Sequence, residues 1–184
     1  MSNSASETRQ VAVHEAGHAA AALVLDRRLP CCVRVSLRHE AGHLPSGSVN
    51  LVHGSPISRD MRLSAAMSRA GETAEMAVFG RFMGDGEDRA VALRRWRDFE
   101  EDEGPHGDDL FESLWSASLD LARWAVEPNL VAVERLADVL SSEPLLQGAR
   151  LERALWRCSF VEPPGPRPSL WTIPEGITRI GPDA

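Results

Sequence analysis

The feature that most constrains the fold is an alanine-rich run over residues 11–25, which has almost no polar residue after His18. Ser4 and Glu7 precede this run with the spacing of a capping box, which predicts the start of a helix there. Pro30 and the two arginines before it end the helix. Because the run is apolar around nearly its whole circumference, we expect a helix that is buried on most sides.

Alternation of apolar and polar residues predicts two strands after this helix, over 33–37 and 48–52. Glycine, proline and serine residues between 42 and 47 predict the turn that joins them. In the first strand the apolar residues are expected to face the core and the polar ones the solvent, with Val33, Val35 and Leu37 inside and Arg34, Ser36 and Arg38 outside. We therefore expect a β-hairpin packed on the first helix.

The spacing of apolar residues predicts that most of the remaining chain is helical. Helices are expected over 58–82, from Asp88 to about 101 with Asp88 as the N-cap, and in three segments between 110 and 157. Prolines accumulate from Val161 onward and predict an extended segment laid over the surface. The sequence thus predicts a mainly α fold with a small β-hairpin, in one domain over 1–160 followed by a proline-rich tail over 161–184.

The first predicted helix contains His14-Glu15-Ala16-Gly17-His18, a pattern of the form H-E-x-x-H. Four residues are slightly more than one turn, so both imidazoles project from one face. This arrangement suits two ligands of a tetrahedral Zn²⁺ ion, and Glu15 on the neighbouring edge can take a proton from a water on the metal. Ala16 and Gly17 are small, which allows a neighbouring element to approach closely. Burying these polar groups without partners would cost on the order of several kcal/mol, so the apolar surroundings favour a metal site.

The same five letters recur at His39-Glu40-Ala41-Gly42-His43. This copy follows a predicted strand and runs into Pro45 and Gly47, where a helix cannot persist. Without a helix the two histidines lose their common face. We interpret the second copy as a hairpin turn and not as a metal site.

A catalytic zinc ion usually has three protein ligands and a water, so a third ligand is expected elsewhere in the chain. Spacing alone does not select it. The candidates are Glu72, Glu75, Asp85, Glu87, Asp88, His53 and His106.

Three segments of the chain resemble a known family. The segment Val13-His14-Glu15-Ala16-Gly17-His18-Ala19 is similar to the zinc helix of peptidase family M41, the protease domain of FtsH-type AAA proteases. The segment Ala70-Gly71-Glu72-Thr73-Ala74-Glu75, followed by Val78-Phe79-Gly80, resembles the A-G-R-x-A-E-E-x-x-F-G helix of that family. Gly84-Asp85-Gly86-Glu87-Asp88 lies where the family has a G-A-S-N-D loop. The resemblance extends over about residues 8–157.

The resemblance implies a helical peptidase domain that binds Zn²⁺, with a small sheet on the H-E-x-x-H helix. It implies Asp88 as the third ligand, with Asp85 as the alternative because the loop keeps little beyond its glycine and aspartate. Glu75 matches a family glutamate and is expected to orient a ligand and not to coordinate zinc itself. An N-cap role remains the other interpretation of Asp88. The ATPase module of the family is not expected, because the chain has no lysine and no G-x-x-x-x-G-K-[ST] motif.

Composition excludes several other classes. The formal net charge of -7 argues against a nucleic-acid partner, because phosphate binding needs a basic surface. No apolar run approaches the roughly 18 residues of a membrane span, and the N-terminus lacks the order of a signal peptide. We therefore expect a cytoplasmic protein without membrane insertion. Cys31 and Cys32 are adjacent and lack the CxxC spacing of a zinc site, so with Cys158 they are expected to be buried thiols.

Together these patterns predict a zinc metalloendopeptidase that hydrolyses unfolded or flexible polypeptides without an ATPase of its own. An extended substrate would add to the edge of the strand at 48–52 or 33–37. The alternative is a catalytically silent, zinc-stabilised binding or regulatory module derived from such a peptidase. In that case the tail would cover the cleft or dock on another subunit, and a homo-oligomer or a separate partner protein is compatible with both hypotheses.

Overall fold

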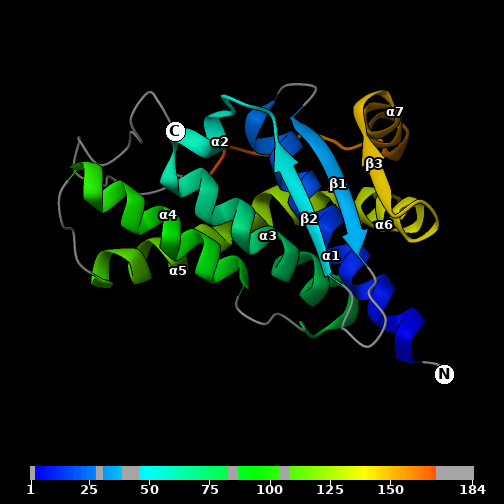
Figure 1. Cartoon of the computed structure of the whole chain (residues 1–184), viewed down its shortest axis with the longest axis horizontal. Helices are drawn as coiled ribbons and strands as arrows, with labels where there is room; N and C mark the ends of the chain where they lie inside the picture. The colour runs from blue at the N-terminus through cyan, green and yellow to red at the C-terminus, as the bar shows by residue number, and fades with distance from the viewer. Residues whose placement is uncertain (1–2, 28–30, 39–45, 83–86, 104–107, 169–184) are drawn as a thin grey trace.

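The computed structural model describes residues 3–27, 31–38, 46–82, 87–103 and 108–168. Within these ranges the protein is mainly helical with a small three-stranded antiparallel sheet, which confirms the predicted fold class (Figure 1). The elements in chain order are α1 (Asn3–Asp26), β1 (Cys32–Arg38), β2 (Ser46–Leu51), α2 (Pro56–Arg59), α3 (Met61–Phe79), α4 (Glu87–Glu103), α5 (Asp108–Val126), the 3-10 helix η1 (Glu127–Asn129), α6 (Leu130–Ser142), β3 (Leu145–Gln147) and α7 (Gly148–Cys158). None of the helices in the described ranges combines the length and apolar character needed to cross a bilayer.

Helix α1 is the central element of the fold. It contacts α3, α5, α6 and both strands of the hairpin, and Figure 1 shows it passing behind the sheet. From residue 12 to residue 22 every side chain except that of His14 is buried, as the apolar run predicts. The helix begins at Asn3, so Ser4 lies inside it and the predicted capping box is wrong. It ends at Asp26, and Arg27 follows with a φ of 57°.

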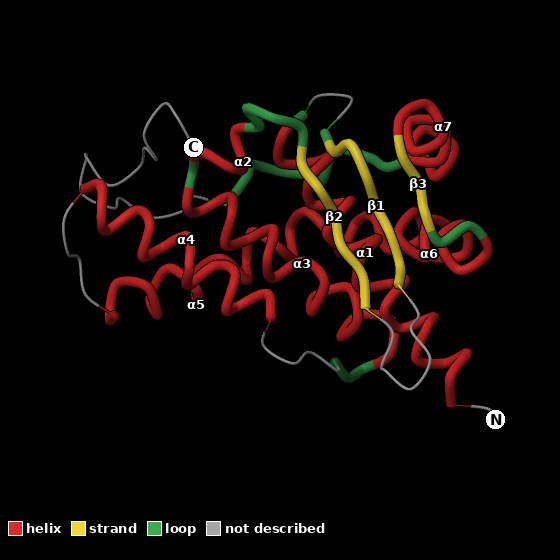
Figure 2. The backbone as a smooth tube through the Cα atoms, viewed as in Figure 1, coloured by secondary structure: helices red, strands yellow, loops and turns green. Residues whose placement is uncertain are grey.

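The sheet has the order β2-β1-β3, and β1 pairs antiparallel with both neighbours (Figure 2). The predicted hairpin is confirmed as β1 and β2, which pack on α1. Ser46 and Gly47 belong to β2, although the sequence placed them in the turn. The second H-E-x-x-H copy, residues 39–43, lies outside the described residues. Strand β3 was not predicted.

The predicted faces of β1 are confirmed for Val35, which is fully buried, and are wrong for Val33, which lies at a bulge, and for Ser36. Cys32 pairs with Leu51 and Arg34 pairs with Asn50, so Val33 is an extra residue that has no counterpart on β2. A bulge of this kind redirects the side chains beside it. Val33 is accordingly 48% exposed. Ser36 lies beyond the bulge and is buried where β1 pairs with both β2 and β3, at Ser48 and Leu145.

Helix boundaries around α3 and α4 differ from the predicted ones. Asp60 has an extended backbone and its side chain caps α3, so the single helix expected over 58–82 is divided into α2 and α3. Gly80 ends α3 in the left-handed conformation, with a φ of 67°, and leaves Phe82 outside it. Helix α4 begins at Glu87. Asp88 therefore lies in the first turn and is not the N-cap.

Two clusters of buried apolar residues form the core. The larger surrounds α1 and is rich in alanine, and the smaller lies between α3, α4 and α5 and contains Trp96, Phe99 and Phe111. Cys31, Cys32 and Cys158 are buried free thiols within the larger cluster.

The described part of the proline-rich tail, residues 161–168, contains neither helix nor strand. It is tied to the helical domain at its start, because the side chain of Asn129 bonds both backbone polar groups of Val161, at 2.7 and 3.0 Å. Glu162 then forms an ion pair with Arg27. Residues 169–184 lie outside the described residues, so the proposed covering role of the tail stays a prediction.

Candidate metal centre

Three side chains from two distant parts of the chain converge at the centre of α1. His14 and His18 lie one turn apart on α1, and Asp88 comes from the first turn of α4. The two Nε2 atoms are 3.0 Å apart, and Oδ2 of Asp88 lies 2.9 Å from that of His14 and 3.3 Å from that of His18. Among the described residues these three form a group that could hold a metal ion. The structure thus brings together the residues that the sequence pattern and the resemblance selected.

Hydrogen bonds at the other ring nitrogen fix both imidazoles. Nδ1 of His18 lies 2.7 Å from the backbone oxygen of Met67, and Nδ1 of His14 lies 2.6 Å from Oε1 of Glu75. A backbone carbonyl can only accept, so Nδ1 of His18 bears the hydrogen, and the Glu75 carboxylate imposes the same tautomer on His14. In neutral rings of this tautomer each Nε2 presents a lone pair towards the other two donor atoms.

This arrangement fits a divalent metal ion. Three lone-pair atoms at 2.9–3.3 Å repel one another unless a cation lies between them. In a tetrahedral site with metal–ligand bonds of about 2.0–2.1 Å, ligand atoms are roughly 3.3–3.4 Å apart. Two imidazole nitrogens and one carboxylate oxygen form a donor set that transition-metal dications favour.

The electrostatics of the cluster also favour positive charge at its centre. Burial alone would lower the pKa of His14, but its hydrogen bonds to Asp88 and Glu75 raise that pKa to about 10. Burial opposes charging of His18 as well, yet the carboxylate of Asp88 raises the pKa of this histidine. Burial would raise the pKa of Asp88, but the adjacent His18 and His14 lower it well below its usual range. The cluster therefore attracts a proton or another cation.

Glu15 lies beside the cluster without taking part in it. Its side chain is 5% exposed, and its Oε2 atom is buried with no hydrogen-bond partner among the described residues. Burial raises the pKa of Glu15, partly offset by the two neighbouring histidines. A buried carboxylate oxygen without a partner is costly, and it is typical of a group that meets its partner in a ligand or substrate.

Three glycines allow neighbouring elements to approach the site residues closely. A Cβ atom on Gly71 would lie 2.5 Å from the His14 ring, and one on Gly47 would lie 2.3 Å from Cγ of Glu15. A Cβ atom on Gly17 would lie 2.6 Å from the backbone oxygen of Ala70. The close approach expected at Gly17 is thus realised by α3. The other two glycines allow α3 and β2 to contact the site residues directly.

Glu75 lies where the resemblance places it, against His14, and is buried. Glu72 instead pairs with Arg69, and His53 lies exposed in a turn. Glu87 is near enough to Glu15 to raise the pKa of that carboxyl, but it does not join the histidine cluster. The two other candidate ligands, Asp85 and His106, lie outside the described residues.

Two contributors to the site were missed by the sequence reasoning. Gln10 lies one turn before His14, and its Nε2 atom donates to Oε2 of Glu75 at 2.5 Å. Its spacing of four residues from His14 was the available signal, but Gln10 ends a polar stretch, after Thr8 and Arg9, and so does not stand out in the sequence. The backbone oxygen of Met67 left no signal, because any residue type supplies the same carbonyl.

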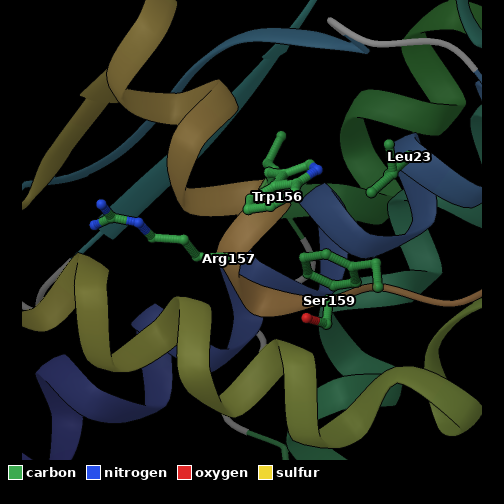
Figure 3. Close-up of a pocket in the computed structure, with 6 residues that line it drawn as sticks. Leu23, Trp156, Arg157 and Ser159 are labelled. Atoms are coloured by element: carbon green, nitrogen blue, oxygen red, sulfur yellow. The ribbon is translucent and has the colours of Figure 1, made fainter.

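A separate hollow of about 540 Å³ lies between α7 and the end of α1. Figure 3 shows Trp156 and Leu23 at this hollow, with Arg157 pointing away from Leu23. Leu23 follows His14 by nine residues, which is about 14 Å along the helix. Arg157 is the one ionisable side chain among the described residues that line the hollow, so no acid–base or metal chemistry is assembled there.

The segments that resemble family M41 are the ones that form the site. Residues 13–19 lie in α1, residues 70–79 in α3, and Asp88 in α4. Comparison of the sequence with models of known protein families gives no match, and neither does comparison with curated proteins. Membership of that family therefore stays a prediction from these segments.

Proposed function

We propose that the protein is a zinc metallopeptidase that hydrolyses unfolded or flexible polypeptides. His14, His18 and Asp88 hold the zinc ion, and Glu15 is the general base. The observation that carries the proposal is the convergence of three lone-pair atoms within 3.3 Å of one another, next to a buried carboxylate oxygen that has no partner among the described residues. When bound, zinc supplies Lewis acidity that polarises a carbonyl group and acidifies water.

Residues of the chain transfer the proton, orient the imidazoles and contribute charge at the site. Glu15 accepts a proton from the attacking water and passes it to the leaving amine, and its burial strengthens it as a base. Glu75 and the Met67 carbonyl hold the two imidazoles so that each Nε2 is free to bind the metal. Asp88 contributes negative charge at the start of α4, where the helix dipole favours it.

The edge of β2 is the surface that supports an extended substrate. Strand β1 is central, so the expectation that 33–37 offers an edge is wrong, and among the described strands β2 pairs only with β1. Gly47 of β2 lies directly against Glu15. A polypeptide that adds to the edge of β2 that is unpaired among the described strands would run past the general base and would be recognised through its backbone, whatever its sequence.

Replacing Glu15 with Gln tests the mechanism. The variant keeps the shape of the side chain and all three proposed ligands, so zinc content should hold. Cleavage of casein should fall by about 10²–10⁴-fold because the base is lost. Glu72→Gln is the matched control, since Glu72 is a glutamate of α3 that pairs with Arg69 away from the cluster.

Three outcomes separate the hypotheses. Unchanged cleavage by Glu15→Gln at full zinc content would contradict the assigned mechanism. Wild-type protein that binds zinc but cleaves neither casein nor unfolded peptides would support the silent, zinc-stabilised module instead. Wild-type protein that binds no zinc would contradict both.

A further inference from the structure

We propose that Gln10 is a positioning residue of the metal centre, which acts through Glu75 to fix the orientation and tautomer of His14. The inference rests on the proposed metal-binding role of the histidines. Gln10 is 3% exposed and lies one turn before His14 on the same side of α1. Its Nε2 atom donates to Oε2 of Glu75 at 2.5 Å, while Nδ1 of His14 lies 2.6 Å from Oε1. Two successive turns of α1 thus hold the two oxygens of one carboxylate from α3.

Holding both oxygens matters because Glu75 is itself buried, at 3% exposure. A glutamate side chain has several rotatable bonds, and a carboxylate bound through one oxygen can still turn about its terminal bond. The bond from Gln10 to the other oxygen restricts this rotation and so helps to define the plane of the carboxylate.

The orientation of Glu75 decides which nitrogen of His14 can bind a metal. With Oε1 facing Nδ1, a His14 ring that gives up one proton to a metal ion keeps its hydrogen on Nδ1 and presents its lone pair on Nε2, towards His18 and Asp88. If the carboxylate turns away, the Nε2–H tautomer becomes accessible and has no lone pair at the site. Gly71 packs against the face of the ring but cannot select the tautomer, because it offers no side-chain acceptor.

The adjacent residue provides a matched control. Arg9 bonds Asp138 and the backbone oxygen of Glu134, so it ties α1 to α6. An Arg9→Met variant removes a tie of α1 without touching the carboxylate of Glu75. It reports what general loosening of this part of α1 does to the site.

The test measures zinc binding to the full-length chain by competition with a chelator. Gln10→Met keeps the length of the side chain and removes its donor, and we expect zinc affinity to fall by about tenfold, at the low end for residues that orient a ligand. Arg9→Met should change it by less than about twofold. ¹⁵N NMR of the histidine rings in zinc-loaded protein should show the wild-type His14 bound through Nε2 with a single sharp Nδ1–H signal, and a broadened Nδ1–H signal in Gln10→Met. If Gln10→Met folds poorly, Gln10→Asn serves instead. It retains the amide but is one methylene too short to reach Glu75, so we expect the same loss of zinc affinity.

A double-mutant cycle shows whether Gln10 acts through Glu75. Adding Gln10→Met to Glu75→Met should reduce affinity by less than about twofold, because the group that Gln10 holds is already gone. Unchanged affinity in folded Gln10→Met, an equal loss in Arg9→Met, or full additivity in the cycle would overturn the inference. The readout is metal binding, so a wild type that binds zinc without cleaving polypeptide would overturn the peptidase and leave this inference intact.

Discussion

The contact between α1 and α3 and the cluster between α4 and α5 are packed in opposite ways. At the first, small residues bring two helix backbones so close that a Cβ atom on Gly17 would lie 2.6 Å from the Ala70 oxygen. At the second, large rings fill the space, with centroids 5.5 Å apart for Trp96 and Phe99 and 6.0 Å apart for Trp96 and Phe111.

The difference indicates that the aromatic cluster mainly supplies stability, whereas the small-residue contact mainly sets the geometry of the metal centre. Each buried aromatic side chain removes about 150–250 Å² from water, so the aromatic cluster contributes much of the hydrophobic stabilisation of its region. The small-residue contact contributes less area per residue, but it sets the distance between the helix that bears the histidines and the helix that orients them. We expect substitutions in the first region to disturb the metal centre and those in the second to lower stability alone.

The largest effect is expected in the aromatic cluster. Phe111→Ala removes a buried ring that contacts Trp96 and Trp115, and should lower the free energy of unfolding by about 3–5 kcal/mol. Zinc affinity of the folded protein should change by less than about threefold. Denaturant titration of metal-free protein and chelator competition measure the two quantities. A parallel fall in affinity would show that the cluster also determines the position of Asp88 and that the two regions are not independent.

At Gly17 we expect a smaller change in the free energy of unfolding, opposite in sign to the usual effect of replacing glycine with alanine in a helix. Glycine to alanine inside a helix normally stabilises by up to about 1 kcal/mol. Here the added methyl group meets the backbone oxygen of Ala70 and Cβ of Ala74, and neither can move without shifting α3. Gly17→Ala should therefore lower the free energy of unfolding by about 1–3 kcal/mol and weaken zinc binding as well. A variant as stable as the wild type would show that the two helices have slack at this contact.

The parts of the fold that the sequence predicted are those with a local cause. The apolar run defined α1, and the i, i+4 spacing of His14 and His18 placed both rings on one face. Asp88 was selected by resemblance and not by spacing, because the residue that faces α1 from α4 depends on how three helices pack.

The features that were missed are non-local or have no side-chain signature. Strand β3 has three residues, too few to show alternation, and it exists because it pairs with Ser36 and its neighbours on β1. The bulge at Val33 depends on how β1 and β2 align. The Met67 carbonyl and the bond from Gln10 to Glu75 depend on the distance between α1 and α3, which local patterns do not contain.

Gly71→Ala separates stability from metal affinity within the small-residue region itself. Its added Cβ atom would lie 2.5 Å from the His14 imidazole, so the conflict is with a side chain that can turn and not with a backbone that cannot. The ring should pivot about its Nδ1 bond to Glu75, the gain in helix propensity should offset much of the strain, and the free energy of unfolding should change by less than about 1 kcal/mol. Turning the ring moves Nε2 away from His18 and Asp88, so zinc affinity should fall about tenfold, or about 1.4 kcal/mol. The same denaturant and chelator titrations should show that Gly17→Ala loses both stability and zinc affinity, whereas Gly71→Ala loses zinc affinity alone. Equal losses of stability in the two variants would mean that the His14 ring is held as rigidly as the backbone of α3.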